Sequence, residues 1–323
     1  MGAASAAAGA LAPSGAGALA PSGLAAWAPA AASDGAAGPS GFSTSGGSSA
    51  SGDAIATAAP SRAADGLDPR DALRLRTQFK REVRRRLTVP PGEQRNYAAR
   101  LQDELAERGL GDLERQYVVL VDRNPNVQAV FIYFRGASTE RWRMIGASPV
   151  STGLPGRYDH FVTPLGVFEH TPQNMDFRAE GTLNENGIRG YGARDMRIFD
   201  FGWTDGERGW GKGGMSQMRF QMHATDPDKL EWLLGTRHSK GCVRIPGSLN
   251  RFFDYHGILD ADYEALADAG NPVPALHPGR SVTPWAGRYL VVIDSGITRR
   301  PAWSPPPRGI ARTRVSAEAS TAD

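Results

Sequence analysis

Cysteine, long apolar runs, internal repeats and excess charge are scarce or missing in this sequence of 323 residues, and each absence removes a class of protein. The single cysteine, Cys242, excludes an intramolecular disulfide and a zinc cluster built on thiolates. No run of about 18 large apolar residues occurs, so no membrane-spanning helix is predicted. No repeat of about 20–50 residues indicates a solenoid. The net charge of +3 is too small to indicate a nucleic-acid partner, and no groove-reading motif accompanies it.

The first 66 residues are of low complexity. Ala, Gly, Ser and Pro fill 53 of these positions, which leaves too few large apolar side chains to offset the entropy of ordering the backbone. We expect residues 1–66 to be a disordered leader or linker, and the tail, 297–323, to be disordered as well. Prolines interrupt the Ala-rich stretch 1–32 and no basic residue precedes Arg62, so an atypical export signal and a plain extension both remain open.

Residues 67–114 are predicted to form a basic helical hairpin. The first helix, 68–88, has apolar residues at a four-residue spacing and carries eight basic residues against three acidic ones. The second helix, 93–108, ends at Gly109, which favours a helix C-terminus. The basic face of the first helix predicts either attachment to an anionic surface or a docking helix whose charged face is solvated.

From residue 115 the pattern becomes that of a mainly β domain, which we place at 115–296. Two β-rich runs, 117–121 and 129–134, flank a turn-forming cluster and predict a β-hairpin. Many short strands and few helices favour a β fold over other classes. The further strands are predicted at 142–147, 166–170, 218–223 and 289–294, and short helices at 227–234, at 248–255 with Ser248 as cap, and at 261–269.

The Gly-rich stretch 201–206 is predicted to be a loop. It carries Phe201 and Trp203, and Trp210 follows shortly after. These aromatic side chains are interpreted either as a wall or lid of a substrate cleft or as core anchors under a long loop. Four histidines receive no chemical role; His256 and His277 are expected at the surface or in packing contacts, and His160 and His170 are left unassigned.

The lone cysteine lies in a run that suits a nucleophile, Ser239-Lys240-Gly241-Cys242-Val243-Arg244. A free thiol is mostly protonated at neutral pH, so a cysteine nucleophile needs a base or positive neighbours, and backbone amides aimed at the developing oxyanion. Gly241 permits the close approach of a substrate carbonyl. The amides of Gly241 and Cys242 are therefore the candidate oxyanion donors.

Charged and basic residues surround this cysteine in the sequence. Lys240, His238 and Arg244 are predicted to place positive charge around the thiol, and His223, 19 positions upstream of Cys242, is the candidate base. The plainer interpretation is that a single cysteine is a small buried apolar residue with a histidine nearby by chance.

The spacing resembles a known signature. His223, fifteen intervening residues and the run 239–244 look like the motif of the L,D-transpeptidases, which have a YkuD-type catalytic domain. The likeness spans about residues 115–296. Shorter runs agree with it, at 151–153, 163–168, 235–237 and 287–293. The resemblance implies a YkuD-like β-sandwich in which Cys242 is the nucleophile and His223 is the proton donor and acceptor. The sequence departs from the family at Lys240, where a histidine is usual.

The resemblance also implies an activity. Cys242 would form a thioester with a stem tetrapeptide of peptidoglycan, release D-alanine and pass the acyl group to a neighbouring stem, giving a 3→3 cross-link, with no metal or organic cofactor. Lys240 would act electrostatically. Ser239 would hydrogen-bond the loop backbone or the substrate, and Arg244 would pair with a substrate carboxylate or brace the loop.

Other outcomes of the same chemistry stay open. Water in place of the amine gives an L,D-carboxypeptidase, and a lysine of an envelope protein as acceptor gives a covalent protein anchor. A non-catalytic wall-binding module is a further alternative, in which Lys240 marks a degenerate site. A peptidoglycan substrate would place the protein in a bacterial periplasm or cell envelope.

Overall fold

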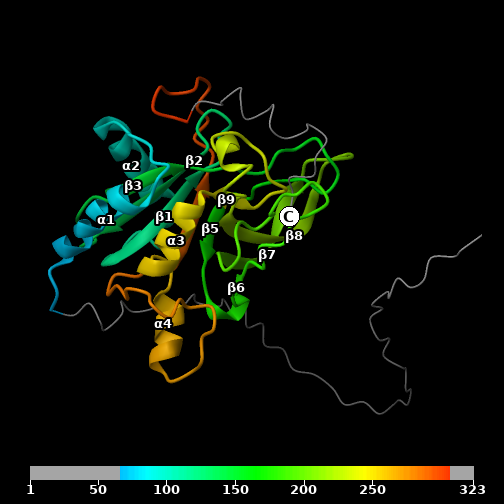
Figure 1. Cartoon of the computed structure of the whole chain (residues 1–323). Helices are drawn as coiled ribbons and strands as arrows, with labels where there is room; N and C mark the ends of the chain where they lie inside the picture. Colours follow the sequence, from blue (N-terminus) through cyan, green and yellow to red (C-terminus); the bar gives the residue numbers. More distant parts are fainter. Residues whose placement is uncertain (1–65, 306–323) are drawn as a thin grey trace, which may run out of the picture. The chain divides into compact units, whose positions relative to one another are not determined.

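The computed structural model describes residues 66–305, and their strands form two sheets (Figure 1). In the first sheet the strand order is β3-β2-β1-β10-β5, with β1 and β10 parallel and the other neighbours antiparallel. The predicted hairpin is confirmed as β1 and β2. The strands of this sheet are β1 (Gln116–Asp122), β2 (Ala129–Arg135), β3 (Arg143–Pro149), β5 (Gly166–Glu169) and β10 (Tyr289–Ile293).

The second sheet has the order β4-β7-β8-β9, and the short strand β6 pairs with β7 beside this path. The long strands β7 and β8 are antiparallel, whereas β8 and β9 run parallel. The bounds are β4 (Phe161–Val162), β6 (Phe177–Arg178), β7 (Arg197–Arg208), β8 (Met215–Ala224) and β9 (Val243–Ile245). The expected mainly β fold with a few short helices is thus confirmed.

Alternation along the strands builds one core between the sheets. In β1, Val119 and Val121 point into it, and in β8 Phe220 and Met222 do the same from the other sheet. Helix α3 (Gly247–His256) adds Leu249, Phe252 and Phe253 to this core. The intervening residues of β8 therefore face away from the core, and these include His223.

The two N-terminal helices do not form the predicted hairpin, because they pack on opposite faces of the first sheet. Helix α1 (Leu75–Glu82) puts Phe79 into the core between the sheets, beside Val119 and Val121. Helix α2 (Pro91–Glu107) covers the other face, where Leu101 and Leu105 meet the intervening residues of β1. Successive strand residues point to opposite faces, so α2 covers the outer face of this sheet, while α1 adds to the inner face that the second sheet and α3 also cover.

The first helix is shorter than predicted. A 3-10 turn (Pro69–Arg74), capped by Asp68, leads into α1, which ends at Glu82 rather than near residue 88. Val83 is extended and fully buried, so core packing overrides the helical pattern. The Leu87 amide then donates to the Ala147 carbonyl at 2.9 Å beside β3. The second helix ends as predicted, before Gly109 at φ +72°.

Residues predicted as a loop belong to β7. Gly202, at φ +82°, lies within a register shift of the β7–β8 pair, so the glycine allows a bulge in a continuous strand. Part of the expected disordered tail is also ordered: Trp303 packs on Tyr97 and Phe131 at ring distances of 5.8 and 6.0 Å. Residues 306–323 and 1–65 lie outside the described part.

The expected short helices are confirmed at two of three positions. They are α3 and α4 (Ala261–Asp268), whereas 227–234 contains only a 3-10 turn, Glu231–Leu233. Ser248 is not the cap of α3, because Pro246 holds that position and the Ser248 hydroxyl instead accepts a hydrogen bond from the Arg84 amide. No helix within residues 66–305 is long and apolar enough to cross a bilayer.

Shortening Phe79 tests whether α1 is an integral part of the core. Phe79 is 3% exposed and meets Phe252 edge-on, with ring centroids 5.4 Å apart. We expect Phe79→Ala to lower the free energy of unfolding by about 3–5 kcal/mol, because it leaves a cavity in the core. Urea denaturation of the full chain measures this. Lys80→Ala, on the exposed side of the same helix, is the control, and equal midpoints for both variants would contradict the packing role.

Candidate active site

The motif with the lone cysteine lies at the start of β9, directly beside the strand that carries His223. The parallel register pairs Met222 with Val243 and His223 with Arg244. Met222 and Val243 point into the core, so His223 projects from the outer face of the second sheet. Cys242 is half-buried, and its Sγ lies 3.8 Å from the Arg219 carbonyl oxygen of β8. The fold thus places Cys242, at the start of β9, beside the strand that carries its predicted base, His223.

Gly241 has a conformation that only glycine adopts readily. Its φ is +142°, and a Cβ there would lie 2.8 Å from Met218 Cε and 3.1 Å from Phe161 Cβ. Its carbonyl accepts a 2.6 Å hydrogen bond from the Thr163 hydroxyl. Gly241 therefore brings the backbone at Cys242 down onto β8 with no space for a side chain.

Ser239 holds the loop from inside. Its hydroxyl donates to the Cys242 carbonyl at 2.6 Å and accepts from the Gly241 amide at 3.1 Å. Ser239 is 1% exposed, so its contacts are with the loop backbone. The Gly241 amide, predicted as an oxyanion donor, is engaged by this hydroxyl. The Cys242 amide remains the candidate donor.

The positive charge predicted around the thiol is weaker than expected. Lys240 Nζ pairs with the Asp159 carboxylate at 3.2 Å. Burial, helped by the nearby guanidinium of Arg244, lowers the pKa of His238 to about 3, so this imidazole is neutral at pH 7. Arg244 itself is 1% exposed and donates from Nη1 to the His238 carbonyl at 3.0 Å. This geometry favours the bracing role of Arg244 over pairing with a substrate.

His223 is fully buried and held in a defined orientation. Its Nδ1 lies 2.9 Å from the Ala224 carbonyl oxygen. A carbonyl only accepts, so Nδ1 carries the proton and Nε2 is the basic nitrogen of the neutral ring. The ring of Tyr191 covers the imidazole at 4.7 Å. Tyr191 belongs to the segment between β6 and β7, and no pattern in the sequence predicts this contact.

Two of the flanking runs that resemble the family, 151–153 and 163–168, contact the motif loop. Ser151 and Arg244 exchange two backbone hydrogen bonds of 3.0 and 2.9 Å. The Thr152 carbonyl accepts from the amides of His238 and Ser239. Residues distant in the sequence thus hold the motif loop in place through hydrogen bonds. Thr163, which follows β4, contributes another through its bond to the Gly241 carbonyl.

The three aromatic residues of the predicted loop have different environments. Phe201 is a core anchor, 5.6 Å from the ring of Phe220. Trp210 packs edge-on against Phe161 at 4.8 Å, next to Gly241's loop. Trp203 is 65% exposed on β7. The core interpretation holds for Phe201, whereas Trp203 is exposed and does not anchor the core.

Two polar residues that the sequence did not single out lie on the outer face beside Cys242. Arg219 Nε donates to both carboxylate oxygens of Asp200, at 3.0 and 2.9 Å. The Gln221 amide donates to the same carboxylate at 2.8 Å. Arg219, Gln221 and His223 alternate along β8 with the core residues, and this period of two was the signal that could have found them.

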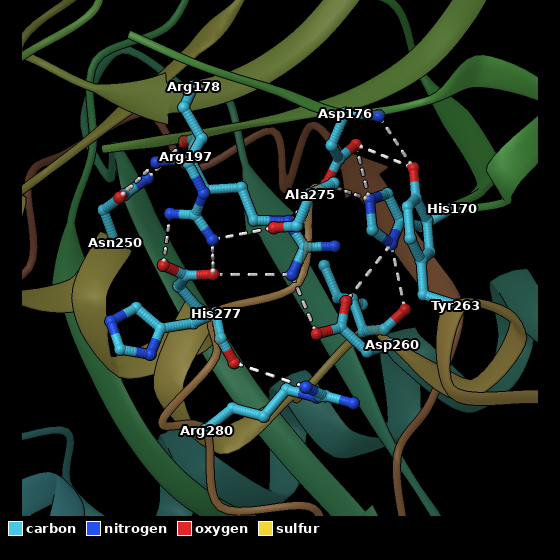
Figure 2. Close-up of polar contacts among 12 residues, drawn as sticks. His170, Asp176, Arg178, Arg197, Asn250, Asp260, Tyr263, Ala275, His277 and Arg280 are labelled. Carbon is cyan, nitrogen blue, oxygen red and sulfur yellow. Dashed lines mark hydrogen bonds and ion pairs between the residues drawn. The ribbon is translucent and has the colours of Figure 1, made fainter. Parts of the chain in front are cut away.

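A buried ionic network supports β7 from the core side (Figure 2). Asp176 accepts hydrogen bonds from Arg197 Nε at 2.6 Å and His170 Nε2 at 2.9 Å, and also from the Asp200 backbone amide at 2.9 Å. Burial alone would lower the pKa of His170, but the carboxylate of Asp176 outweighs it and the pKa is raised. His170, unassigned from the sequence, is part of this support.

The other histidines have structural contacts. His256 Nε2 lies 2.7 Å from the Glu82 carboxylate and joins α3 to α1. His160 Nδ1 lies 3.0 Å from the Leu154 carbonyl oxygen. Among residues 66–305 no group of three or more His, Cys, Asp or Glu side chains is arranged to hold a metal ion.

Comparison with known proteins gives weak structural likenesses. No protein-family profile matches the sequence, and no curated protein matches it. A structure of Bd1075 from Bdellovibrio bacteriovorus is similar at TM-score 0.25 and 16% identity, over 55% of this chain and 47% of that one. The chain therefore spans about half the length of that structure.

Two further structures give similar values. A fused Zn-dependent amidase/peptidase/peptidoglycan-binding protein from Clostridium acetobutylicum aligns at TM-score 0.26 and 8% identity, over 64% of each chain. The helical cell shape determining protein Pgp2 from Campylobacter jejuni aligns at TM-score 0.25 and 14% identity, over 62% of this chain and 54% of that one. TM-scores this low establish neither a shared fold nor a shared activity.

Gly241→Ala is expected to disrupt the motif loop. The new Cβ meets Met218 and Phe161, and φ +142° is unfavourable for alanine, so the free energy of unfolding should fall by about 1–3 kcal/mol. Urea denaturation measures the change. Gly92→Ala in α2, where nothing lies within 4 Å of the new Cβ, is the matched control. A Gly241 variant as stable as the control would contradict the argument.

His238 predicts an acid-dependent loss of stability. Its pKa is about 3 in the folded chain against an ordinary value of 6.5, so the unfolded chain binds one more proton between these values. Stability then falls as the pH falls below 6.5, by at most about 1.4 kcal/mol per pH unit. In His238→Gln the loss between pH 6.5 and 5 should be smaller by about 1.5 kcal/mol in urea denaturation.

The half-exposed His277 provides the control for this experiment, as His277→Gln removes a histidine from a different environment. An acid-induced loss as steep in His238→Gln as in the unmodified protein would show that His238 is not held neutral.

Proposed function

We propose that the protein is a cysteine acyltransferase that acts on the stem peptides of peptidoglycan, as an L,D-transpeptidase does. One observation carries the proposal: Cys242 follows a glycine at φ +142° at the start of β9, and the parallel neighbour β8 carries His223 with Nδ1 bonded to a carbonyl. A nucleophile, a base of defined tautomer and a backbone amide at the nucleophile are the parts that acyl transfer needs. The motif's spacing adds the substrate class.

The first half of the reaction makes a thioester. His223 Nε2 takes the proton of Cys242, and the sulfur attacks the carbonyl carbon of the third residue of a stem tetrapeptide. The oxyanion of the tetrahedral intermediate accepts a hydrogen bond from the Cys242 amide, a contribution of about 3–4 kcal/mol for a well-placed donor. When the C–N bond breaks, the terminal D-alanine leaves with the proton from His223.

The second half passes the acyl group on. An amine of a neighbouring stem attacks the thioester carbon, His223 accepts a proton from that amine, and the thiol is regenerated as the new amide forms. Water in place of the amine gives the tripeptide instead. Such a substrate would place the protein outside the cytoplasmic membrane.

The charges of the site decide how the thiol is activated. Lys240 is paired with Asp159 and His238 is neutral, so neither offers an unpaired positive charge to stabilise a thiolate. Arg244 is buried and its Nη1 is engaged by the His238 carbonyl. We therefore assign the activation to proton removal by His223. Lys240 in place of histidine does not remove any part of this step, because the base lies on β8.

Intact-protein mass spectrometry with a purified disaccharide-tetrapeptide tests the proposal on the full chain. We expect a covalent adduct and released D-alanine from the unmodified protein, no adduct from Cys242→Ala, and a rate lowered by at least about 100-fold in His223→Gln. The ratio of cross-linked dimer to tripeptide then identifies the acceptor as amine or water.

His277→Gln is the matched control for His223→Gln and should retain the activity. Folded protein that gives neither adduct nor D-alanine would overturn the proposal in favour of a binding module.

A further inference from the structure

Arg219 presents an unusual guanidinium on β8, the strand beside the candidate nucleophile, with its side chain turned toward β7. Its two hydrogen bonds to Asp200 both leave from Nε, and neither Nη atom has a hydrogen-bond partner among residues 66–305. The side chain is 38% exposed, whereas Asp200 is 1% exposed. The guanidinium is thus held through Nε, while Nη1 and Nη2 are available to a ligand.

Asp200 does not need the Nη atoms of this guanidinium. Besides Arg219 Nε, its oxygens accept from the Gly202 amide and the Gln221 side chain, each at 2.8 Å. The Asp200 amide itself donates a hydrogen bond to Asp176 of the buried network. The carboxylate is therefore satisfied by its own surroundings and acts as a rigid anchor for Arg219.

Trp203 forms a platform for the same guanidinium. It is the direct cross-strand neighbour of Arg219 in the β7–β8 pair, and the guanidinium carbon lies 5.8 Å from its ring centroid. The ring is 65% exposed. A stacked guanidinium keeps its plane, so the two free Nη groups point in a fixed direction.

We propose that Arg219 binds the free C-terminal carboxylate of the donor peptide and so selects substrates that end one residue after the scissile bond. This inference rests on the proposed acyl transfer at Cys242. An end-on guanidinium matches a carboxylate through two parallel hydrogen bonds. The carboxylate of the leaving residue lies about 3.5 Å beyond the carbonyl under attack. Cys242 Sγ approaches β8 at the backbone carbonyl oxygen of Arg219, 3.8 Å away. The Arg219 side chain extends from there to Asp200 and Trp203 on β7. Arg219 is the specificity-determining residue, and Asp200 positions it.

The test compares a disaccharide-tetrapeptide with its C-terminal amide. In the unmodified protein we expect kcat/KM for acylation to be about 10- to 100-fold higher for the acid than for the amide, the range expected for a charge-assisted bidentate contact. Arg219→Gln should lose this discrimination by slowing the acid alone, and Arg219→Lys should restore part of it. Arg143→Gln, which removes an exposed arginine on β3, should keep the full discrimination.

A merely structural role for Arg219 would slow both substrates equally, and this result would overturn the inference. Equal acylation of acid and amide by the unmodified protein would overturn it too, while leaving the acyl transfer intact. Binding of both peptides to Cys242→Ala, measured by calorimetry, separates the two proposals when no acylation occurs. Tighter binding of the acid that depends on Arg219 supports the carboxylate site even then, and equal Kd values refute it.

Discussion

The placement of the candidate nucleophile depends on one backbone conformation, that of Gly241. The chain must pass close over β8 to enter β9 in parallel, and Met218 and Phe161 leave no space for a side chain there. Thr163 and Ser239 then hold the turn through its carbonyl and amide. Because these contacts come from several distant segments, the loop is fixed by the tertiary fold rather than by its own sequence, as preorganised sites require.

A second constraint reaches the site from the core. Asp176, Arg197 and His170 form a buried ionic cluster whose formation costs desolvation, so it is weak evidence for stability. Its structural effect is clearer: Asp176 binds the Asp200 amide next to the bulge of β7. That contact fixes the backbone position of Asp200 in β7. The position of the Asp200 carboxylate, which binds Arg219, depends on it. The buried carboxylate of Asp176 thus influences where the partly exposed Arg219 side chain is held.

Local patterns were enough to predict the hairpin of β1 and β2 and two of the short helices, whereas the parallel pairing of β8 with β9 beside Cys242 was not predicted. Local patterns failed where contacts between distant residues determine the charge of a side chain or the end of an element. Asp159 forms an ion pair with Lys240 from 81 positions away, and burial keeps His238 neutral. Gly202 indicated a loop but allows a bulge within β7. Helix α1 ends before Val83, because the extended backbone there lets the Val83 side chain pack in the core. A single sequence contains no direct record of such contacts.

The role of Lys240, where the motif that the sequence resembles has a histidine, can be judged from the same contacts. A residue at this position contributes to the site through its backbone as well as its side chain, and the Lys240 carbonyl accepts a 2.8 Å hydrogen bond from the Phe161 amide. That bond forms with any side chain, whereas the ammonium turns to Asp159 on the exposed side of the loop. A histidine is therefore not needed to hold the loop. The basic nitrogen on β8 is provided by His223, whose orientation depends on Ala224 and Tyr191 and not on residue 240.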